Sequence, residues 1–319
     1  MLRFLVRRIL QGALVVWIIS IIVFALFYVA PNNVARSIAG RQATAQTVQT
    51  IREDLGLDEP LLEQYWNFFI GLLQGDLGYS YYTDQPVTAI IADAAPVTIS
   101  LALGAAVIWL ILGIGIGLLS ALRPRSLSDR FATTFALFFY SMPTFLLGLL
   151  LLYFAYFQLS QAGVEWFAAS GYEPITDGVG EWARHMILPW ITLALVLTGT
   201  YIRLTRGSML DVLGEDYIRT ARAKGISERR VTLRHGLRSG ITPVVTQFGV
   251  DIGTLVGGVL ITEQVFGIQG LGYRAVTSVV QGDLPVVLGV VMVASVVTVV
   301  ANIVVDFSYA FLDPRVRLH

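Results

Sequence analysis

The sequence predicts an all-α polytopic membrane protein, and three observations support that fold class. Of the 319 residues, 55% are apolar and 14% are charged, whereas a soluble domain usually carries about 25% charged residues. The apolar residues gather in runs of about 20, the length that a helix needs to cross the hydrocarbon core of a bilayer. The charged residues gather between these runs.

Six transmembrane helices are predicted, over residues 9–30, 97–121, 132–159, 187–205, 241–262 and 284–306. The first apolar run is too long for a signal peptide and lacks a small-residue cleavage site, so we expect residues 1–30 to form a retained anchor helix. Six spans place both termini on one side of the membrane. If that side is the cytoplasm, 17 of the 22 basic residues lie in inside segments, as the positive-inside rule requires. We therefore expect an inner-membrane protein with cytoplasmic termini.

The outer segment 31–95 is too long for a simple connection and is acidic, with eight carboxylates and three arginines. Helix-like apolar spacing, interrupted at Pro60 and Gly75, predicts a small external subdomain of short helices. Four aromatic residues in it are expected at the membrane interface. They are Tyr65, Trp66, Phe68 and Phe69.

The residue types that most catalytic and metal sites need are scarce. The chain has no cysteine and three widely separated histidines, so we expect no metal site. Its one lysine, Lys224, lies between Ala223 and Gly225, which excludes a G-x-x-x-x-G-K-[ST] phosphate loop. If ATP drives this protein, another chain hydrolyses it. We also find no nucleophile–base pair, and therefore predict that the chain is not an enzyme.

The densest charge lies in the loop 203–240, which carries nine basic residues. Residues 216–224 are predicted to form a short helix that ends at Gly225, a residue that tolerates the left-handed conformation. Ser227 is expected to cap a second helix running to about Arg238, and Pro243 is expected in the first turn of the fifth span. The alternative is a solvated basic loop that satisfies membrane topology and contacts anionic lipids.

The pattern "TARAKG" with a proline 18 residues after the glycine resembles the E-A-A-x-x-x-G signature of ABC importer permeases, in the form of their dipeptide, oligopeptide and nickel branch. Arg219 and Thr220 stand where the general signature has Glu and Ala. Further segments resemble the same family in order along the whole chain. They are "GDLGYSYYTDQPV" (75–87), "APVTISLAL" (95–103), "SMPTFLLGLLLL" (141–152), "LPWITLAL" (188–195), "RLTRGSMLDVLGEDYIRTARAKG" (203–225), "EQVFGIQGLG" (263–272) and "DPR" (313–315).

This resemblance implies a type I ABC importer permease fold, with a permease core over 96–319 and a coupling loop over 203–240. It implies a coupling helix that fits a cleft on an ATPase subunit, with Ala221 and Ala223 allowing close docking and arginines at the rim. The residues expected to contact the ATPase are Arg219, Thr220, Ala221, Arg222, Ala223, Lys224, Gly225, Ser227 and Arg229.

The implied partners are a second homologous permease subunit, two ABC ATPase subunits that bind ATP and Mg, an external solute-binding protein and the lipid bilayer. No cofactor in this chain and no nucleic acid are expected. The implied function is inward movement of a peptide or a similar small solute. The sequence leaves open whether the solute is a dipeptide, an oligopeptide or a nickel chelate, and whether the permease pair is a homodimer.

The fifth span places an aspartate, Asp251, near the middle of the bilayer, where a charge is costly unless it faces protein or water. At about 100° per residue, one stripe of this helix carries mostly polar residues and is predicted to line the translocation path. These are Gln247, Asp251, Thr254, Gly258 and Thr262. Gly249, Gly253 and Gly257 lie on another face, which suits close helix packing. The alternative is that Asp251 only hydrogen-bonds a neighbouring span.

Two other function classes require features that the sequence does not show. A secondary transporter driven by an ion gradient would favour proton-relay chains or broken helices in matching halves, and the sequence indicates neither. A membrane enzyme would need a catalytic constellation. The importer permease remains the leading prediction, with the secondary transporter as the alternative.

Overall fold

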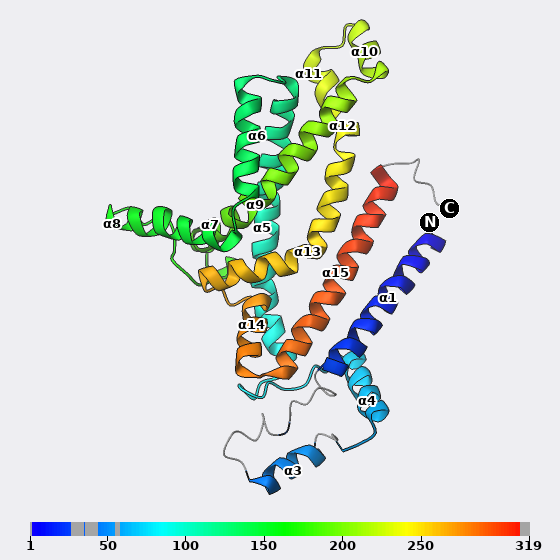
Figure 1. Cartoon of the computed structure of the whole chain (residues 1–319), viewed down its shortest axis with the longest axis vertical. Helices are drawn as coiled ribbons and strands as arrows, with labels where there is room; N and C mark the ends of the chain where they lie inside the picture. The colour runs from blue at the N-terminus through cyan, green and yellow to red at the C-terminus, as the bar shows by residue number, and fades with distance from the viewer. Residues whose placement is uncertain (1, 27–34, 36–43, 55–57, 313–319) are drawn as a thin grey trace. The chain divides into compact units, whose positions relative to one another are not determined.

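A computed structural model describes residues 2–26, 35, 44–54 and 58–312 (Figure 1). Within these residues all regular secondary structure is helical, apart from one isolated bridge between Tyr79 and Pro86. The chain divides into two compact units: Met1–Pro96 with Gly270–Val300, and Val97–Gln269 with Ala301–His319. The all-α prediction is therefore confirmed for the described part of the chain.

The first unit contains short helices in the segment 31–95, where the sequence predicts them. Its elements are α1 (Leu2–Phe24), α3 (Ala45–Asp54), α4 (Leu61–Gln74), the start of α5 (Val87–Leu122), α14 (Leu271–Gln281) and most of α15 (Leu284–Leu312). As predicted, α4 begins after Pro60 and ends at Gly75, which has a left-handed φ of 80°. Tyr65 of α4 packs edge-on against Phe24 of α1 and hydrogen-bonds Ser20.

The second unit forms a helical bundle. After the rest of α5, its elements are α6 (Leu127–Tyr140), α7 (Thr144–Leu151), the π-helix η2 (Leu152–Gln158), α8 (Leu159–Gln161), the 3₁₀ turn η3 (Ile175–Asp177), α9 (Val179–Leu213), α10 (Asp216–Ala223), α11 (Glu228–Arg230), the π-helix η4 (Val231–Gly236), α12 (Leu237–Gly240) and α13 (Thr242–Phe266). Its core is built around buried Trp109, Tyr201 and Phe266, contributed by α5, α9 and α13.

Five helices among the described residues are long and apolar enough to cross a membrane. They are Leu5–Phe24, Val87–Leu122, Thr144–Gln161, Val179–Leu213 and Leu284–Val304. The predicted fifth span, 241–262, corresponds to helix α13, in which the side chains of 253, 254 and 256–258 fall outside the description. That α13 crosses the membrane, and with it the six-span count, stays a prediction.

The third predicted span, 132–159, is not one continuous helix. The chain leaves α6 at Ser141 and begins α7 after Pro143, and the two helices run in different directions (Figure 1). Proline lacks the backbone N–H that would continue the helical hydrogen bonds, and it disfavours the helical conformation of the residue before it. The candidate membrane segment is therefore Thr144–Gln161. The mostly apolar composition of residues 132–159 predicts one continuous helix and gives no sign of this break.

Glycines bring α5 and α9 into close contact. A Cβ atom added at Gly104 would lie 2.1 Å from the indole of Trp190, one at Gly113 would lie 2.3 Å from Cβ of Tyr201, and one at Gly117 would lie 2.7 Å from Cβ of Thr205. These distances are far below ordinary contact, so at these positions the α5 backbone lies directly against side chains of α9 because glycine has no side chain of its own. Such close approach is a common way for membrane helices to associate.

We expect Gly113→Ala to destabilise the protein by about 1–3 kcal/mol, the usual effect of an added methyl group in a filled core. The matched control is Gly115→Ala, because a Cβ at Gly115 meets nothing within 4 Å. Thermal unfolding of the detergent-purified variants provides the measurement. Equal melting temperatures for the two variants would contradict the close packing of α5 against α9.

Candidate functional site

The elbow, residues 214–240, follows directly from the end of α9 (Figure 1). Its first helix, α10, ends in a Schellman motif, in which the Gly225 N–H donates to the Arg222 carbonyl at 2.9 Å and the Ile226 N–H to the Ala221 carbonyl at 3.3 Å. Gly225 has a φ of 74°, as predicted. No atom lies within 4 Å of a Cβ added there. The backbone conformation, rather than lack of space, therefore favours glycine.

A small apolar core holds the elbow together. Ile218, Ala221 and Val231 are buried in it, and Leu213 and Ile226 pack against them. Ala221 was expected to dock into a partner, but its side chain is 8% exposed and lies inside the elbow. The small size of Ala221 thus serves close packing between α10 and η4, while Ala223 is exposed.

An ion pair connects the two arms of the elbow. Arg222 donates from Nε to Glu228 Oε2 at 3.0 Å and from Nη2 to Oε1 at 2.6 Å. The hydrogen bond and charge of Glu228 raise the pKa of Arg222, and Arg222 lowers the pKa of Glu228 in return. Arg222 was expected at the rim of a partner cleft, but its guanidinium is already engaged within the elbow.

The second arm begins at Ser227, as predicted, but the Ser227 side chain does not cap it. No side-chain capping bond forms there; the Ser227 carbonyl accepts from the N–H groups of Arg230 and Val231 instead. The arm continues through α11, η4 and α12 to Gly240. Pro243 follows in the first turn of α13, as predicted.

The base of the elbow lies against the end of α9. Ser208 Oγ donates to the Gly240 carbonyl at 2.8 Å. Cβ atoms added at Gly236 and Gly240 would lie 3.2 and 2.6 Å from atoms of the fully buried Met209. The two arms are therefore both fixed to α9, one covalently and one by close packing.

Several side chains of the predicted set are exposed on the elbow. Arg219, Thr220, Ala223, Lys224 and Arg229 are exposed. Arg219 pairs at 3.3 Å with Asp216, which is itself 95% exposed, so this pair contributes little to stability. A short helix with a cationic, small-residue surface on a rigid support is suited to insertion into a groove on a partner.

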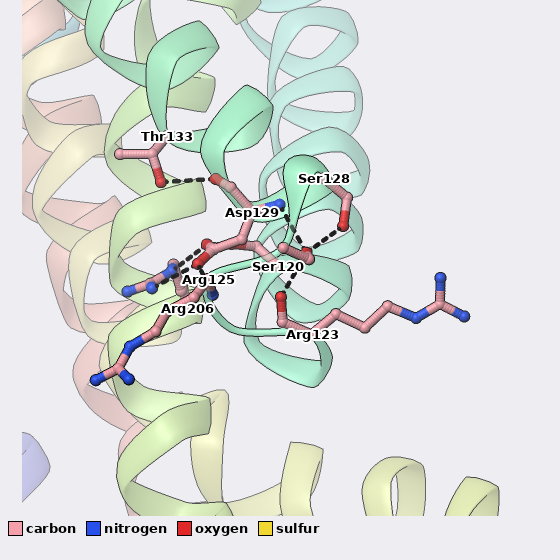
Figure 2. Close-up of polar contacts among 8 residues, drawn as sticks. Ser120, Arg123, Arg125, Ser128, Asp129, Thr133 and Arg206 are labelled. Carbon is pink, nitrogen blue, oxygen red and sulfur yellow. Dashed lines mark hydrogen bonds and ion pairs between the residues drawn. The ribbon is translucent and has the colours of Figure 1, made fainter.

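A buried carboxylate at the α5–α6 turn connects this turn to α9 (Figure 2). Asp129 is 4% exposed and accepts hydrogen bonds from four donors. Arg206 contributes Nε at 2.6 Å and Nη2 at 2.9 Å, the Arg125 N–H contributes one at 2.8 Å, and Ser120 Oγ contributes the fourth. These donors, with that of Arg206 first, hold the pKa of Asp129 far below its usual range.

This joint is not among the features predicted from the sequence. A local signal was present: "SLSD" (126–129) has the spacing of a capping box. Ser126 indeed caps α6 by accepting from the Asp129 N–H at 3.2 Å. The partner Arg206 is 77 residues away in sequence, and local spacing carries no information about it.

Asp251 of α13 is enclosed within the second unit. It is 8% exposed, and its carboxylate accepts from Tyr201 Oη at 2.8 Å and from Gln247 Nε2 at 2.9 Å. Thr262 is fully buried. Gly249 is buried. Gly253, Thr254, Gly257 and Gly258 also lie in α13, but the structure does not describe their burial. The hydrogen bond from Tyr201 of α9 is a bond to a neighbouring helix, as in the alternative prediction that Asp251 only hydrogen-bonds a neighbouring span.

Two further buried carboxylates were not singled out from the sequence. Glu263 is fully buried and accepts from Thr98 Oγ1 at 2.6 Å, which connects the end of α13 to α5. In the first unit, Asp283 accepts from Ser80 Oγ at 2.5 Å and the Tyr81 N–H at 3.0 Å. Asp283 thereby holds the turn of the segment "GDLGYSYY".

The helical bundle, the five apolar helices and the elbow agree with what sequence comparison finds. Residues 113–318 match the model of the binding-protein-dependent transport system inner membrane component, and residues 1–102 match the N-terminal model of the same systems. The chain therefore belongs to this family of inner-membrane ABC transporter permeases.

Similar proteins extend over the full length. A protein of Sinorhizobium fredii named "probable peptide ABC transporter permease protein" is 37% identical over 314 residues, which cover 98% of this chain and 99% of that protein. The glutathione transport system permease protein of Escherichia coli K12 is 38% identical over 317 residues, or 99% of each chain.

We expect Asp129→Asn to destabilise the protein by about 3 kcal/mol, because it leaves Arg206 without its counter-ion in a largely buried site. The estimate is at the low end for such pairs, since the Arg206 side chain is 31% exposed. Asp211→Asn, at an exposed position of α9, is the matched control and should lie within about 0.5 kcal/mol of wild type. Thermal unfolding measures both.

The stability difference between wild type and Asp129→Asn should depend on pH. The folded-state pKa of Asp129 is lowered, so its stabilising contribution is complete above the unfolded-state value, about 3.9, and is lost as the pH falls towards the folded-state pKa. The two proteins should therefore differ by the full amount at neutral pH and begin to converge as the pH falls below about 4. A difference that grows on acidification would contradict the ion pair.

Proposed function

We propose that this chain is the permease subunit of an ATP-driven importer that moves a peptide or a similar small solute inward. In this proposal it pairs with a second homologous permease, receives solute from an external binding protein, and is driven by two ATPase subunits that bind ATP and Mg. The observation that carries the proposal is the elbow: a rigid helix–glycine–helix unit, mounted on α9, with a cationic outer face. Relatives named for peptide and glutathione transport support the solute class.

Transport in inverted or right-side-out vesicles tests the energy source. Uptake of a labelled peptide by cells or vesicles that contain the complete system should require ATP and persist after the proton gradient is collapsed. Uptake that stops with the gradient while ATP remains present would instead establish an ion-driven secondary transporter.

We further propose cytoplasmic termini, an external segment 31–95 as a subdomain separate from the permease core 96–319, and six membrane crossings. The arginine distribution supports this orientation. Single cysteines near residues 55, 172 and 275 should react with an impermeant reagent from outside, and those near 126, 228 and 317 should not. A cysteine at 228 that reacts only from outside would reverse the orientation.

The exposed face of the elbow is proposed as the ATPase contact, with Gly225 shaping it. Gly225→Val forces a β-branched residue into the left-handed region, at a cost of at least about 1–2 kcal/mol. We expect normal membrane insertion but several-fold weaker co-purification of the ATPase and slower uptake. Gly225→Asn is the matched control, since asparagine adopts this conformation more readily than other side chains.

If Gly225→Val transports at the wild-type rate, the elbow is a solvated loop instead of a coupling element. The contribution of the exposed charges is measured separately with Arg219→Ala and Arg229→Ala. These variants should weaken ATPase binding without changing the fold, because both side chains are exposed.

We propose that the α13 stripe of Gln247, Asp251, Thr254, Gly258 and Thr262 borders the solute path, with Tyr201 holding Asp251 in position. Asp251→Asn keeps the shape and the acceptor for Tyr201 but removes the charge. We expect normal assembly and ATPase binding with an altered rate or selectivity of uptake.

The control is Tyr201→Phe, which removes only the hydroxyl that bonds Asp251. If Asp251 serves the fold alone, Tyr201→Phe should lower the melting temperature and Asp251→Asn should leave uptake unchanged. Cysteines at 247, 251 and 254 should also react with aqueous reagents during transport. Reaction at 249 and 253 instead would assign the path to the other face of α13.

A further inference from the structure

The first unit contains a groove that the proposed transport function does not use. It lies between α1 and α4 and encloses about 580 Å³, within the size range of small-molecule sites. Trp17 of α1 forms one side. The α4 side is formed by a stripe of residues at helical spacing, with Tyr65 at its inner edge. This stripe comprises Leu62, Glu63, Trp66 and Asn67, and Glu59, which lies just before Pro60 and outside the helix, completes this side.

Two carboxylates lie in the wall of this groove. The Asn67 amide donates to Glu59 at 3.3 Å, and Glu63 lies in the first turn of α4. Among the described residues, no basic side chain forms an ion pair with either glutamate. Two like charges in one groove repel each other, and a cation placed between them would remove that repulsion.

The remaining wall is aromatic. Trp17 is 44% exposed and Trp66 is 59% exposed, so large parts of both rings are open to a ligand. Indole faces attract cations, above all those of the ammonium type. Carboxylates with indole rings in one groove therefore favour an organic ammonium group over a metal ion or an anion.

The position of the groove identifies the source of that ammonium group. Trp17 lies within the candidate membrane span Leu5–Phe24, about 10 Å along the helix from Phe24 at 1.5 Å per residue. The groove thus extends from the end of a membrane helix into its apolar part. A soluble amine would leave the apolar wall, including Leu62, unfilled, whereas a lipid has an acyl chain beside its headgroup.

We propose that the α1–α4 groove binds a zwitterionic phospholipid with a primary ammonium headgroup, of the phosphatidylethanolamine type. The ammonium lies between Glu59 and Glu63 and against the Trp66 ring, and the upper acyl chain lies along Trp17 and Leu62. The bound lipid holds α4 against α1 at the membrane interface. This proposal is independent of what the protein transports.

Tryptophan quenching by brominated lipids tests it. The full-length chain, with the subunits that accompany it, is reconstituted in nanodiscs that contain a fixed fraction of either brominated phosphatidylethanolamine or brominated phosphatidylglycerol. The Trp66 signal is the difference in fluorescence between wild type and Trp66→Phe. We expect the ethanolamine lipid to quench it about two- to five-fold more effectively, the factor that corresponds to an exposed cation–aromatic contact.

The paired variant Glu59→Gln with Glu63→Gln should abolish this preference while the chain remains folded, because both side chains are exposed. Glu173→Gln, an exposed carboxylate of the second unit, is the matched control and should retain the preference. Equal quenching by the two lipids in wild type would overturn the proposal. So would protection of Trp66 from both lipids, the result expected if a protein subunit fills the groove.

Discussion

The ion pair between Asp129 and Arg206 fixes the geometry on which the elbow depends. A carboxylate with 4% exposure needs compensation for lost hydration, and four donors from α5, the α5–α6 turn and α9 provide it. Arg206 lies within the same uninterrupted helix that ends at Leu213. Because a helix is stiff over two turns, the end of α9 that carries the elbow is held in place relative to this joint and, through it, to α5 and α6.

Close backbone approach at glycine recurs in the second unit and has the same physical purpose each time. Gly104, Gly113 and Gly117 bring α5 against α9, and Gly236 and Gly240 bring the second arm of the elbow against Met209. At each of these positions the glycine leaves room for a side chain of the neighbouring helix to lie directly against the backbone. An ion pair and tightly packed helices therefore connect the base of the elbow to the bundle core.

The features that the sequence predicted well are those encoded within a few residues. The left-handed turn at Gly225, the breakers Pro60 and Gly75, and Pro243 in the first turn of α13 all follow from local backbone chemistry. Family resemblance along the whole chain supplied the class of protein.

The features that were missed depend on distant partners or on competition between signals. Pro143 was present in the sequence, but the apolar run around it indicated one continuous span. Ala221 and Arg222 have neighbours within the elbow, Val231 and Glu228, that the spacing of residues 216–225 does not reveal. The pairs of Asp129 with Arg206 and of Glu263 with Thr98 join residues 77 and 165 positions apart. No spacing rule connects such residues, because only the folded chain brings them together.

The π-helix η4 determines the rotational phase of the elbow. Val231 faces the elbow core, and Gly236 and Gly240 both face Met209, so the contacts are spaced five and then four residues apart. In a regular α-helix, five residues turn the chain by about 500°, which would point Val231 about 140° away from Gly236. The wider π turn accommodates one residue more per turn and keeps both contacts in phase. Deleting one residue from this turn would leave the elbow helical. Either Val231 could then pack in the elbow core or Gly236 and Gly240 could pack against Met209, but not both.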